Sequence, residues 1–262
     1  MVFNLNDEVM FNLNDDQMTV DEWNYTKMWV DEFLQYLDEK EREIKPLEEK
    51  SEQELFLDKC ATAVYEYAKS MEPGITDDIR LLASNTSGTL LGKYDQQTGL
   101  INPSHVLKEK VSIERKILSD SIAYQGDYEL ASKNIRDSVR YTIIFEDDKY
   151  TESVDEFLHE LENLGYYDIE VKNNWGTQVC QGINVKLKNS YGMYFEIQFH
   201  TPFGHHIKEE CTRTLYRVIR DEEADYRLKF LANKLRRILQ SKVKAPADAL
   251  EYRFVSNTKW RK

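Results

Sequence analysis

Four short segments in the middle of the chain alternate apolar and polar side chains, which is the period of a β-strand. In the last of them, every second residue is a large apolar one, and the residues between are Glu196, Gln198 and His200. Between the first two segments, residues 151–164 carry apolar side chains at helical spacing, and Gly165 is a typical helix end. The predicted strands are 139–145, 167–171, 183–188 and 193–199.

Helical patterns flank these strands on both sides. We expect helices over 20–40 and 55–69, an interruption at Pro73-Gly74, a third helix beginning at Thr76, and a charged, helical remainder after Pro202. The motif FNLND occurs at 3–7 and again at 11–15 and predicts a short hairpin. The order of elements predicts an α+β fold: a mixed, mostly antiparallel sheet with helices on one face, plus N- and C-terminal helical extensions.

If the apolar faces of the strands pack on helices, the polar faces together form one open surface. Two interpretations of that surface are open: a solvated sheet face, which antiparallel sheets commonly have, or the floor of an active site. The recurrence of amides and histidine beside carboxylates favours the active site. Asp137 precedes the first strand and has the wrong parity to join this face by alternation alone. The residues on the predicted polar face are Arg140, Asn184, Lys186, Glu196, Gln198 and His200.

Charge and cysteine content limit the classes of function. The 262-residue chain has a net charge of −12, which argues against coating nucleic acid or anionic membrane by bulk charge. A local basic cluster is still enough for a phosphate-bearing ligand. The three cysteines are far apart and form no metal-binding spacing, so we expect a reducing, cytoplasmic setting. No apolar run is long enough to span a bilayer, and the N-terminus does not resemble a signal peptide.

Several short motifs, in a fixed order, resemble the synthetase domain of the RelA/SpoT family, and most closely its single-domain alarmone synthetases and their toxin relatives. The resemblance covers residues 55–220 and implies a nucleotidyltransferase-like synthetase fold there, with an accessory segment at 1–54 and a helical tail at 221–262. The metal motif of the family's hydrolase domain has no counterpart. The motifs are LKEKVSIERKI (107–117), DSVRYTI (137–143), KNNW (172–175), QGIN (181–184), FEIQFHTP (195–202) and LYRVIR (215–220).

The resemblance implies a reaction in which ATP gives its β,γ-pyrophosphate to a 3′-hydroxyl and AMP leaves. The acceptor in the family is GDP or GTP, and in the toxin branch the 3′ end of tRNA or an adenine nucleotide. The implied cofactor is Mg²⁺, and a protein inhibitor or antitoxin is a further expected partner. Neither the acceptor nor the oligomeric state follows from the sequence.

The resemblance also assigns roles to individual residues. Asp137 and Glu196 are expected to hold Mg²⁺, with Glu196 as general base and Gln198 as its orienting partner. Other interpretations remain: Asp137 as a capping acid, Glu196 as cross-strand partner of Lys186, and the basic segment as an ordinary helix start. Expected contacts to ATP are Lys108, Lys110, Ser112, Arg115, Lys116, Arg140, His200 and Lys208. Expected contacts to the acceptor are Lys172, Trp175, Cys180, Gln181 and Asn184.

Three positions depart from the family pattern. Cys180 stands where relatives have a tyrosine that stacks on the acceptor guanine, Val106 replaces an arginine near the adenine, and Arg213 replaces a histidine. The acids are kept while both nucleotide-recognition regions are altered. We therefore expect the donor reaction to be kept and the preference for GDP to be altered, so that the acceptor can be other than a free guanosine nucleotide. Cys180 and Val106 support an alternative hypothesis, in which a degenerate synthetase fold binds a nucleotide or a protein partner without turnover.

Overall fold

The computed structural model describes residues 20–42, 51–91, 93–94, 101–102, 106–177, 180–221 and 224–256. The hairpin predicted for the first fifteen residues lies outside this part of the chain. The chain forms two compact units. The helical unit comprises residues 1–48, 174–181 and 202–245, and the sheet unit comprises residues 49–173, 182–201 and 246–262.

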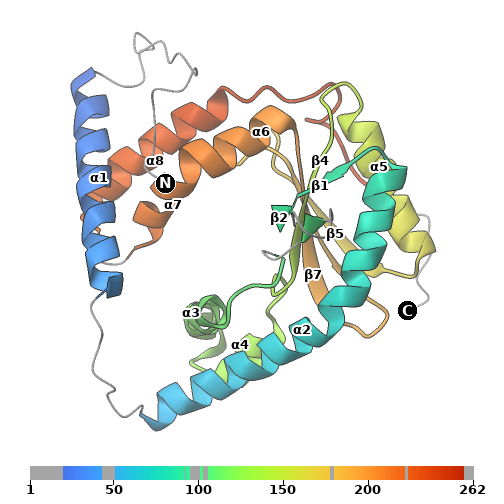
Figure 1. Cartoon of the computed structure of the whole chain (residues 1–262), viewed down its shortest axis with the longest axis horizontal. Helices are drawn as coiled ribbons and strands as arrows, with labels where there is room; N and C mark the ends of the chain where they lie inside the picture. The colour runs from blue at the N-terminus through green and yellow to red at the C-terminus, as the bar shows by residue number, and fades with distance from the viewer. Residues whose placement is uncertain are drawn as a thin grey trace. The chain divides into compact units, whose positions relative to one another are not determined.

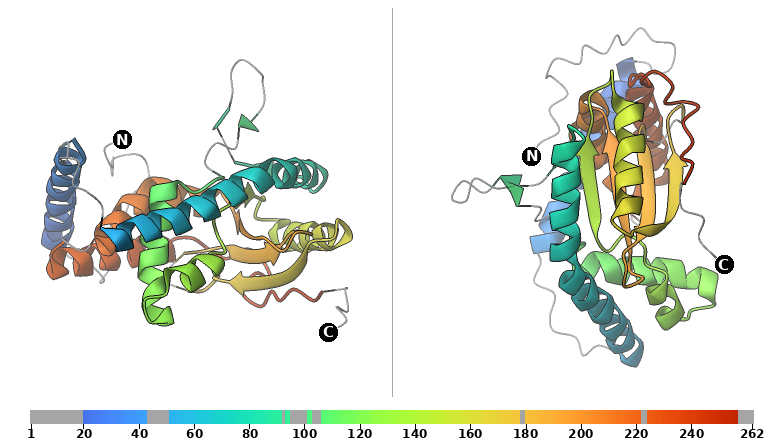
Figure 2. Two further views of the ribbon diagram at one scale, coloured as in Figure 1. Left: turned by 90° about the horizontal axis from the view of Figure 1, so that it is seen from below. Right: turned by 90° about the vertical axis from the view of Figure 1, so that its right-hand side faces the viewer.

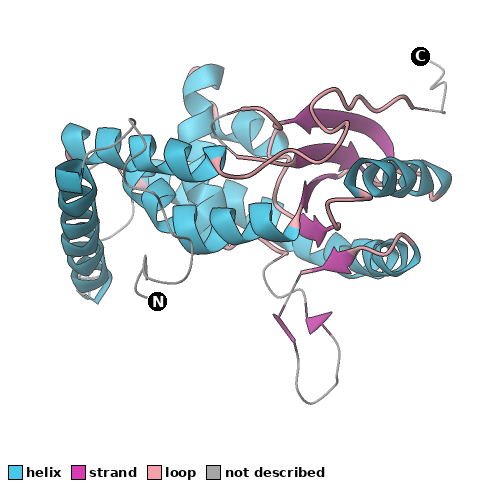
Figure 3. Ribbon diagram, turned by 90° about the horizontal axis from the view of Figure 1, so that it is seen from above, coloured by secondary structure: helices cyan, strands magenta, loops and turns pink. Residues whose placement is uncertain are grey.

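A five-stranded sheet is the centre of the sheet unit (Figure 1). Its strand order is β1 (Thr89–Leu90), β4 (Arg140–Ile144), β7 (Tyr194–His200), β6 (Ile183–Lys188) and β5 (Tyr167–Asn173). Strands β4 and β7 are parallel, and the other neighbouring pairs are antiparallel. Two further short strands, β2 (Lys93–Tyr94) and β3 (Ile101–Asn102), pair separately (Figure 3). The predicted α+β class with a mixed, mostly antiparallel sheet is confirmed.

The apolar face of the sheet packs against the helices α2 (Glu52–Asn85) and α5 (Tyr150–Asn163) (Figure 2). The Phe157 ring of α5 lies 5.4 Å from that of Phe199 and 6.3 Å from that of Phe145. Burying one such side chain stabilises the fold by about 1.5–3 kcal/mol. A one-residue shift in the register of any strand would turn its buried side chains to the other face and lose several of these contributions. The apolar strand side chains that are no more than 1% exposed are Tyr141, Ile143, Ile183, Val185, Leu187, Phe195, Ile197 and Phe199, and Phe145, directly after β4, is equally buried.

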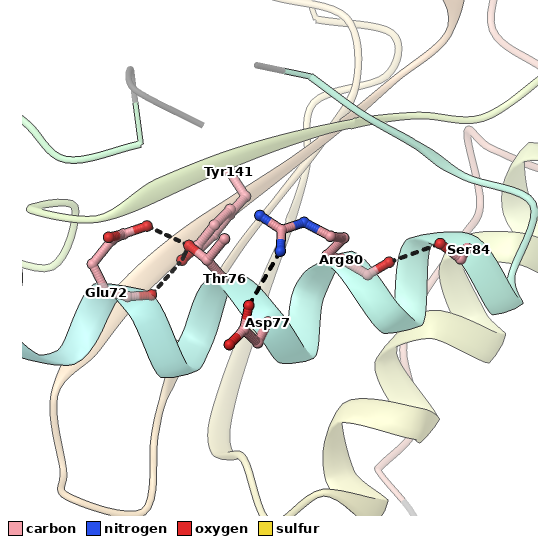
Figure 4. A network of polar contacts seen from close by, with 6 residues as sticks. All are labelled: Glu72, Thr76, Asp77, Arg80, Ser84 and Tyr141. Carbon is pink, nitrogen blue, oxygen red and sulfur yellow. Dashed lines mark hydrogen bonds and ion pairs between the residues drawn. The ribbon is translucent and has the colours of Figure 1, made fainter. Parts of the chain in front are cut away.

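Helix α2 runs without interruption through Pro73-Gly74, so the predicted interruption there is wrong. It begins with a capping box at Ser51. A proline inside a helix costs roughly 3 kcal/mol, but the next two turns bury Ile75, Ile79 and Leu82, and that burial outweighs the cost. The turn at Pro73 is also tied to the sheet, because the Tyr141 hydroxyl lies 2.8 Å from Thr76 Oγ1 and donates to the Glu72 carbonyl at 3.5 Å (Figure 4).

The sheet unit contains a second, smaller core beside α2. Helix α3 (Lys110–Ser121), the 3₁₀ turn η1 (Ile122–Tyr124) and helix α4 (Tyr128–Lys133) surround it. Its buried residues include Cys60, Ile113, Ile117 and Ala131. This packing places the N-terminal half of α3 next to the segment that leads into β4, because Lys108 N donates to Ser138 O at 2.8 Å.

The last described residues, 246–256, form an irregular segment along α5 and β5, whereas the charge pattern predicts a helix to the end of the chain. Asn173 Nδ2 donates to Ala249 O at 2.7 Å, and the Tyr252 hydroxyl donates to Asp155 Oδ1 at 3.0 Å. Pro246 disfavours continuation of a helix, and these contacts cover the outer edge of strand β5.

The helical unit contains α1 (Val20–Arg42), α6 (Pro202–His206), the π-helical turn η2 (Ile207–Thr212), α7 (Arg213–Arg220) and α8 (Tyr226–Ser241). Helix α1 packs against α7 and α8 (Figures 1 and 2). Gln240 of α8 links the segment 174–181 to η2, since its Oε1 accepts from Gln181 N at 3.2 Å and its Nε2 donates to Thr212 Oγ1 at 3.3 Å. Within the described residues, no helix has the length and apolar character needed to cross a membrane.

The continuity of α2 can be tested with two glycines that have free space around them. A Cβ at Gly74 or at Gly165 would meet nothing within 4 Å, but Gly165 has φ +89°. Gly74→Ala should therefore raise the free energy of unfolding by about 0.5–1 kcal/mol, because alanine loses less entropy than glycine in a helix. Gly165→Ala should lower it by about 1–2 kcal/mol through left-handed strain. Urea denaturation measures both, and destabilisation by Gly74→Ala would argue against a continuous helix.

Candidate active site

The strand register aligns polar side chains in rows across one face of the sheet. Because partners in the ladder share a face, the predicted common polar face of β4, β7 and β6 is confirmed. One row consists of Arg140, Glu196, Lys186 and Glu170, on β4, β7, β6 and β5 in that order. The next row consists of Thr142, Gln198, Asn184 and Lys172.

Glu196 is the best-defined acid on this face. Its residue is 7% exposed, and its Oε1 accepts hydrogen bonds from Asn184 Nδ2 at 3.0 Å and from Gln198 Nε2 at 2.8 Å. Gln198 is also 7% exposed, and His200 is fully buried. A merely solvated face would not bury these groups, so that interpretation fails for β7. Keeping the carboxylate of Glu196 out of water between two neutral amides destabilises the fold, which favours a chemical role for Glu196 over a structural one.

A second acid lies where the chain enters β4. Lys108 Nζ is 2.5 Å from Asp137 Oδ2, and Lys116 Nζ is 3.8 Å from Asp137 Oδ1. Glu196 N donates to Val139 O at 3.0 Å, so the backbone at Glu196 is bonded to a residue only two positions after Asp137. The structure therefore brings Lys108, Lys116, Asp137 and Arg140 to the end of the strand pair that carries Glu196.

Three cations, Lys108, Lys116 and Arg140, act on Asp137, and Lys116 also pairs with Asp120 Oδ2 at 3.6 Å. Burial by itself raises the pKa of Asp137, but the hydrogen bond from Lys108 and the positive charges of Lys108, Lys116 and Arg140 together lower it. Burial, reinforced by Lys116 and Arg140, lowers the pKa of Lys108 despite its bond to Asp137. Burial is the largest cause for Lys108, whereas the neighbouring cations decide the direction for Asp137. The three cations around this carboxylate make its surroundings locally positive. In a chain with net charge −12, such a local excess of positive charge is suited to binding phosphate.

The carboxylates of Asp137 and Glu196 are chemically suited to Mg²⁺, and their binding of one metal ion stays a prediction. Asp137 Oδ1 is buried and has no hydrogen-bond partner within the described residues, and the same is true of Asn184 Oδ1. Mg²⁺ prefers oxygen ligands and is typically held by one or two carboxylates together with substrate phosphates. In the described part of the chain no group of three or more His, Cys, Asp or Glu side chains could hold a metal by itself.

Other predicted ATP contacts lie around this cluster with differing surroundings. Lys110 Nζ is bound to Asp58 Oδ1 at 2.8 Å, on α2. Ser112 lies one helical turn before Lys116, and Arg115 is exposed on α3. Their roles toward ATP stay predictions.

His200 is enclosed by the backbone of the QGIN motif. Gly182 has φ +143°, and a Cβ there would lie 2.6 Å from His200 Nδ1 and 2.6 Å from Phe199 O. The motif therefore needs glycine at this position for a close approach to β7. Among the predicted acceptor contacts, Asn184 binds Glu196, while Lys172 is exposed on β5.

Four predicted site residues belong to the helical unit. Trp175 is buried, and Cys180 is partly exposed. Gln181 Oε1 accepts from Gly176 N at 3.1 Å, which shapes the turn between them. Lys208 Nζ lies 3.4 Å from Glu209 Oε1. Their roles in nucleotide binding stay predictions.

Sequence reasoning missed a charged network around Tyr194. The Arg136 guanidinium lies 4.4 Å from the Tyr194 ring centre and pairs with Glu170 Oε1 at 2.7 Å. Lys188 Nζ lies 4.4 Å from the same ring and 2.9 Å from Asp168 Oδ2. Alternation places Tyr194 and Lys188 on the polar face, but Arg136 reaches them from outside the strands, where no periodic pattern applies.

Comparison with known proteins gives structural matches only. No protein-family model and no curated protein sequence matches the chain. A complex of the type VI effector Tas1 with its immunity protein matches with a TM-score of 0.44 and 19% identity over 71% of this chain and 98% of that one. A GTP pyrophosphokinase family protein from Streptococcus pneumoniae matches at 0.35 and 14% over 74% and 91%. Small alarmone synthetase 1 from Bacillus subtilis, bound to its product pppGpp, matches at 0.33 and 14% over 72% and 93%. Proteins of the class that the sequence motifs resemble are thus among the structural matches, at low identity.

The charge imbalance at Asp137 predicts an asymmetry between two substitutions. Asp137→Asn removes the counter-charge of the partly buried Lys108, which then faces Lys116 and Arg140, and should lower the free energy of unfolding by about 1–3 kcal/mol at pH 7. Lys108→Gln removes one of three cations and should lower the free energy of unfolding by a clearly smaller amount. Denaturant titration of both variants against wild type measures this, and an equal or reversed order would contradict the proposed imbalance.

The same pair predicts a pH dependence. Because the pKa of Asp137 is lower in the folded state, its stabilising contribution is present above the unfolded pKa and is lost as pH falls through the folded one. The stability difference between wild type and Asp137→Asn should therefore shrink below about pH 4. A difference that stays constant from pH 7 to pH 3 would be inconsistent with an ionised Asp137.

Proposed function

We propose that the chain is an ATP-dependent pyrophosphokinase, which transfers the β,γ-pyrophosphate of ATP to the 3′-hydroxyl of a nucleotide or of tRNA. The main support is the environment of Glu196, a buried carboxylate fixed by two amides on a face that also carries Arg140. The order of motifs that resemble the RelA/SpoT synthetase domain supports the same reaction.

Glu196 is suited to accept the proton of the attacking hydroxyl. Asn184 and Gln198 both bond to Oε1, and within the described residues no bond to Oε2 is made, so that oxygen is the one available to a proton or metal. Amides that cannot be deprotonated orient the carboxylate without competing for the proton. General base catalysis of this kind typically contributes about 10²–10⁴-fold to the rate.

The cluster around Asp137 is suited to the donor. Lys108, Lys116 and Arg140 supply positive charge for the triphosphate, and pyrophosphoryl transfer depends mainly on positioning and on neutralising that charge. Mg²⁺, when bound by Asp137 and Glu196, supplies further neutralisation of the transferred group. The ion pair with Lys108 holds Asp137 in place before the substrate arrives, and we expect Lys108 to shift toward the phosphates when they bind.

In the proposed step, the 3′-oxygen of the acceptor forms a bond to the β-phosphorus of ATP. The bond between that phosphorus and the oxygen bridging to the α-phosphorus breaks, and AMP leaves with that oxygen. The hydroxyl proton passes to Glu196. Holding the two substrates in line for this displacement is worth about 7–11 kcal/mol of the barrier.

The acceptor class is open between a free nucleotide and the 3′ end of tRNA. Cys180 has no ring, and loss of base–aromatic stacking weakens binding by about 1–3 kcal/mol. Incubation with γ-labelled ATP and separate fractions of cellular nucleotides and RNA identifies the acceptor by the fraction that takes up label.

Glu196→Gln tests the proposed base. Gln preserves the shape and can still accept the two amide bonds, so the fold should persist while AMP release falls by at least about 10²-fold. Glu170→Gln is the matched control, because Glu170 lies in the same row of the same face but is half exposed and paired with Arg136. AMP release is measured by chromatography in reactions that contain ATP, Mg²⁺ and the acceptor that took up label in the preceding experiment.

Equal AMP release by wild type and Glu196→Gln would rule out Glu196 as the base. Tight ATP binding by calorimetry, with no AMP release from wild type for GDP, GTP, adenine nucleotides or uncharged tRNA, would instead favour a nucleotide-binding module.

Expression of the full chain and of a form lacking residues 1–54, each scored for growth arrest, tests whether the accessory segment restrains a toxic activity.

A further inference from the structure

The helical unit contains a strongly basic segment in an acidic protein. Helices α7 and α8 carry three and five Lys or Arg residues, respectively, and neither contains Asp or Glu. Residues 213–244 together have ten Lys or Arg against four acids, all four within 221–225, while the whole chain has a net charge of −12. The proposed pyrophosphokinase reaction gives no role to this segment.

Large aromatic side chains are exposed among these cations. Tyr226 is 74% exposed and Phe230 is 65% exposed, one helical turn apart on α8. Tyr216 of α7 is 46% exposed. Acidic helix α1 packs against α7 and α8, and these exposed fractions apply with α1 in place. Large apolar rings are usually buried, so several exposed rings on one helix pair indicate a binding surface.

Tyr216 already has guanidinium groups beside it. Arg220 Cζ lies 5.5 Å and Arg236 Cζ lies 6.0 Å from the centre of its ring. Arg236 comes from α8, so the contact joins the two basic helices. Alternating rings and guanidinium groups are the combination with which proteins hold single-stranded nucleic acid: the cations follow the phosphates and the rings stack on bases.

Two other partners fit less well. A bilayer-binding helix inserts an aliphatic face, but Leu228, Ala232, Leu235 and Leu239 of α8 are buried in the protein. An acidic protein would satisfy the cations, but the guanidinium groups beside the Tyr216 ring match the bases and phosphates of a nucleic-acid strand more closely. We propose that the α7–α8 surface, defined by Tyr216, Arg220, Arg227, Tyr226 and Phe230, binds single-stranded nucleic acid through its phosphates and bases.

Fluorescence anisotropy with fluorescein-labelled, unstructured 20-nucleotide RNA and DNA tests this surface. Wild type should bind, and with two phosphate contacts, from Arg220 and Arg227, the logarithm of the association constant should fall with the logarithm of salt concentration with a slope of about −1.4. Tyr226→Ala with Phe230→Ala should weaken binding by about tenfold or more through lost stacking. Arg220→Gln should make the slope shallower by about 0.7.

Matched controls separate this surface from the candidate active site. Tyr191→Ala removes a ring that is also 74% exposed but lies in the β6–β7 turn, and it should leave binding unchanged. Glu196→Gln should also leave strand binding unchanged, so loss of pyrophosphokinase activity and loss of strand binding are distinguishable. Absence of binding at 50 mM salt, or equal weakening by Tyr191→Ala and the double variant, would overturn the proposal. Preferential binding of a labelled poly-glutamate peptide would overturn it in favour of an acidic protein.

Discussion

The parallel pairing of β4 with β7 is the constraint on which the candidate active site depends. It sets Arg140 opposite Glu196 and Thr142 opposite Gln198, and it bonds the backbone of Glu196 to Val139. The acid at position 137 then comes close to this strand pair through chain connectivity, although its parity is wrong for the polar face. The approach of Lys108 to Asp137 follows from where β4 begins, because Lys108 N donates to Ser138 O.

The strands and the amphipathic helix α5 could be predicted from sequence because their side chains alternate between a buried and a polar face. The continuity of α2 could not, since Pro73-Gly74 is a local signal for an ending and the opposing burial of Ile75 and Ile79 arises only in the tertiary structure. The irregular segment after Pro246 was missed for a related reason: charge density describes solvent exposure but not the contacts with Asn173 and Asp155.

For the site, alternation placed Glu196, Gln198 and Asn184 on one face but gave no indication that Glu196 would be buried. β7 is the central strand of the sheet, between β4 and β6, and that position comes from the strand order, which alternation does not encode. The pairing of Asp137 with Lys108, and of Arg136 with Glu170, joins residues from irregular segments. The sequence shows that these residues are charged or polar, but only the folded structure shows which residues they pair with.

The central claim is that Asp137 and Glu196 face one triphosphate and its metal ion. The most direct measurement is a crystal structure with a non-hydrolysable ATP analogue and Mn²⁺, whose anomalous scattering locates the metal in place of Mg²⁺. The account predicts an anomalous peak bound by Asp137 and Glu196, with Lys108 moved from Asp137 to the phosphates. A metal bound elsewhere, or phosphates bound away from Lys108 and Arg140, would contradict it.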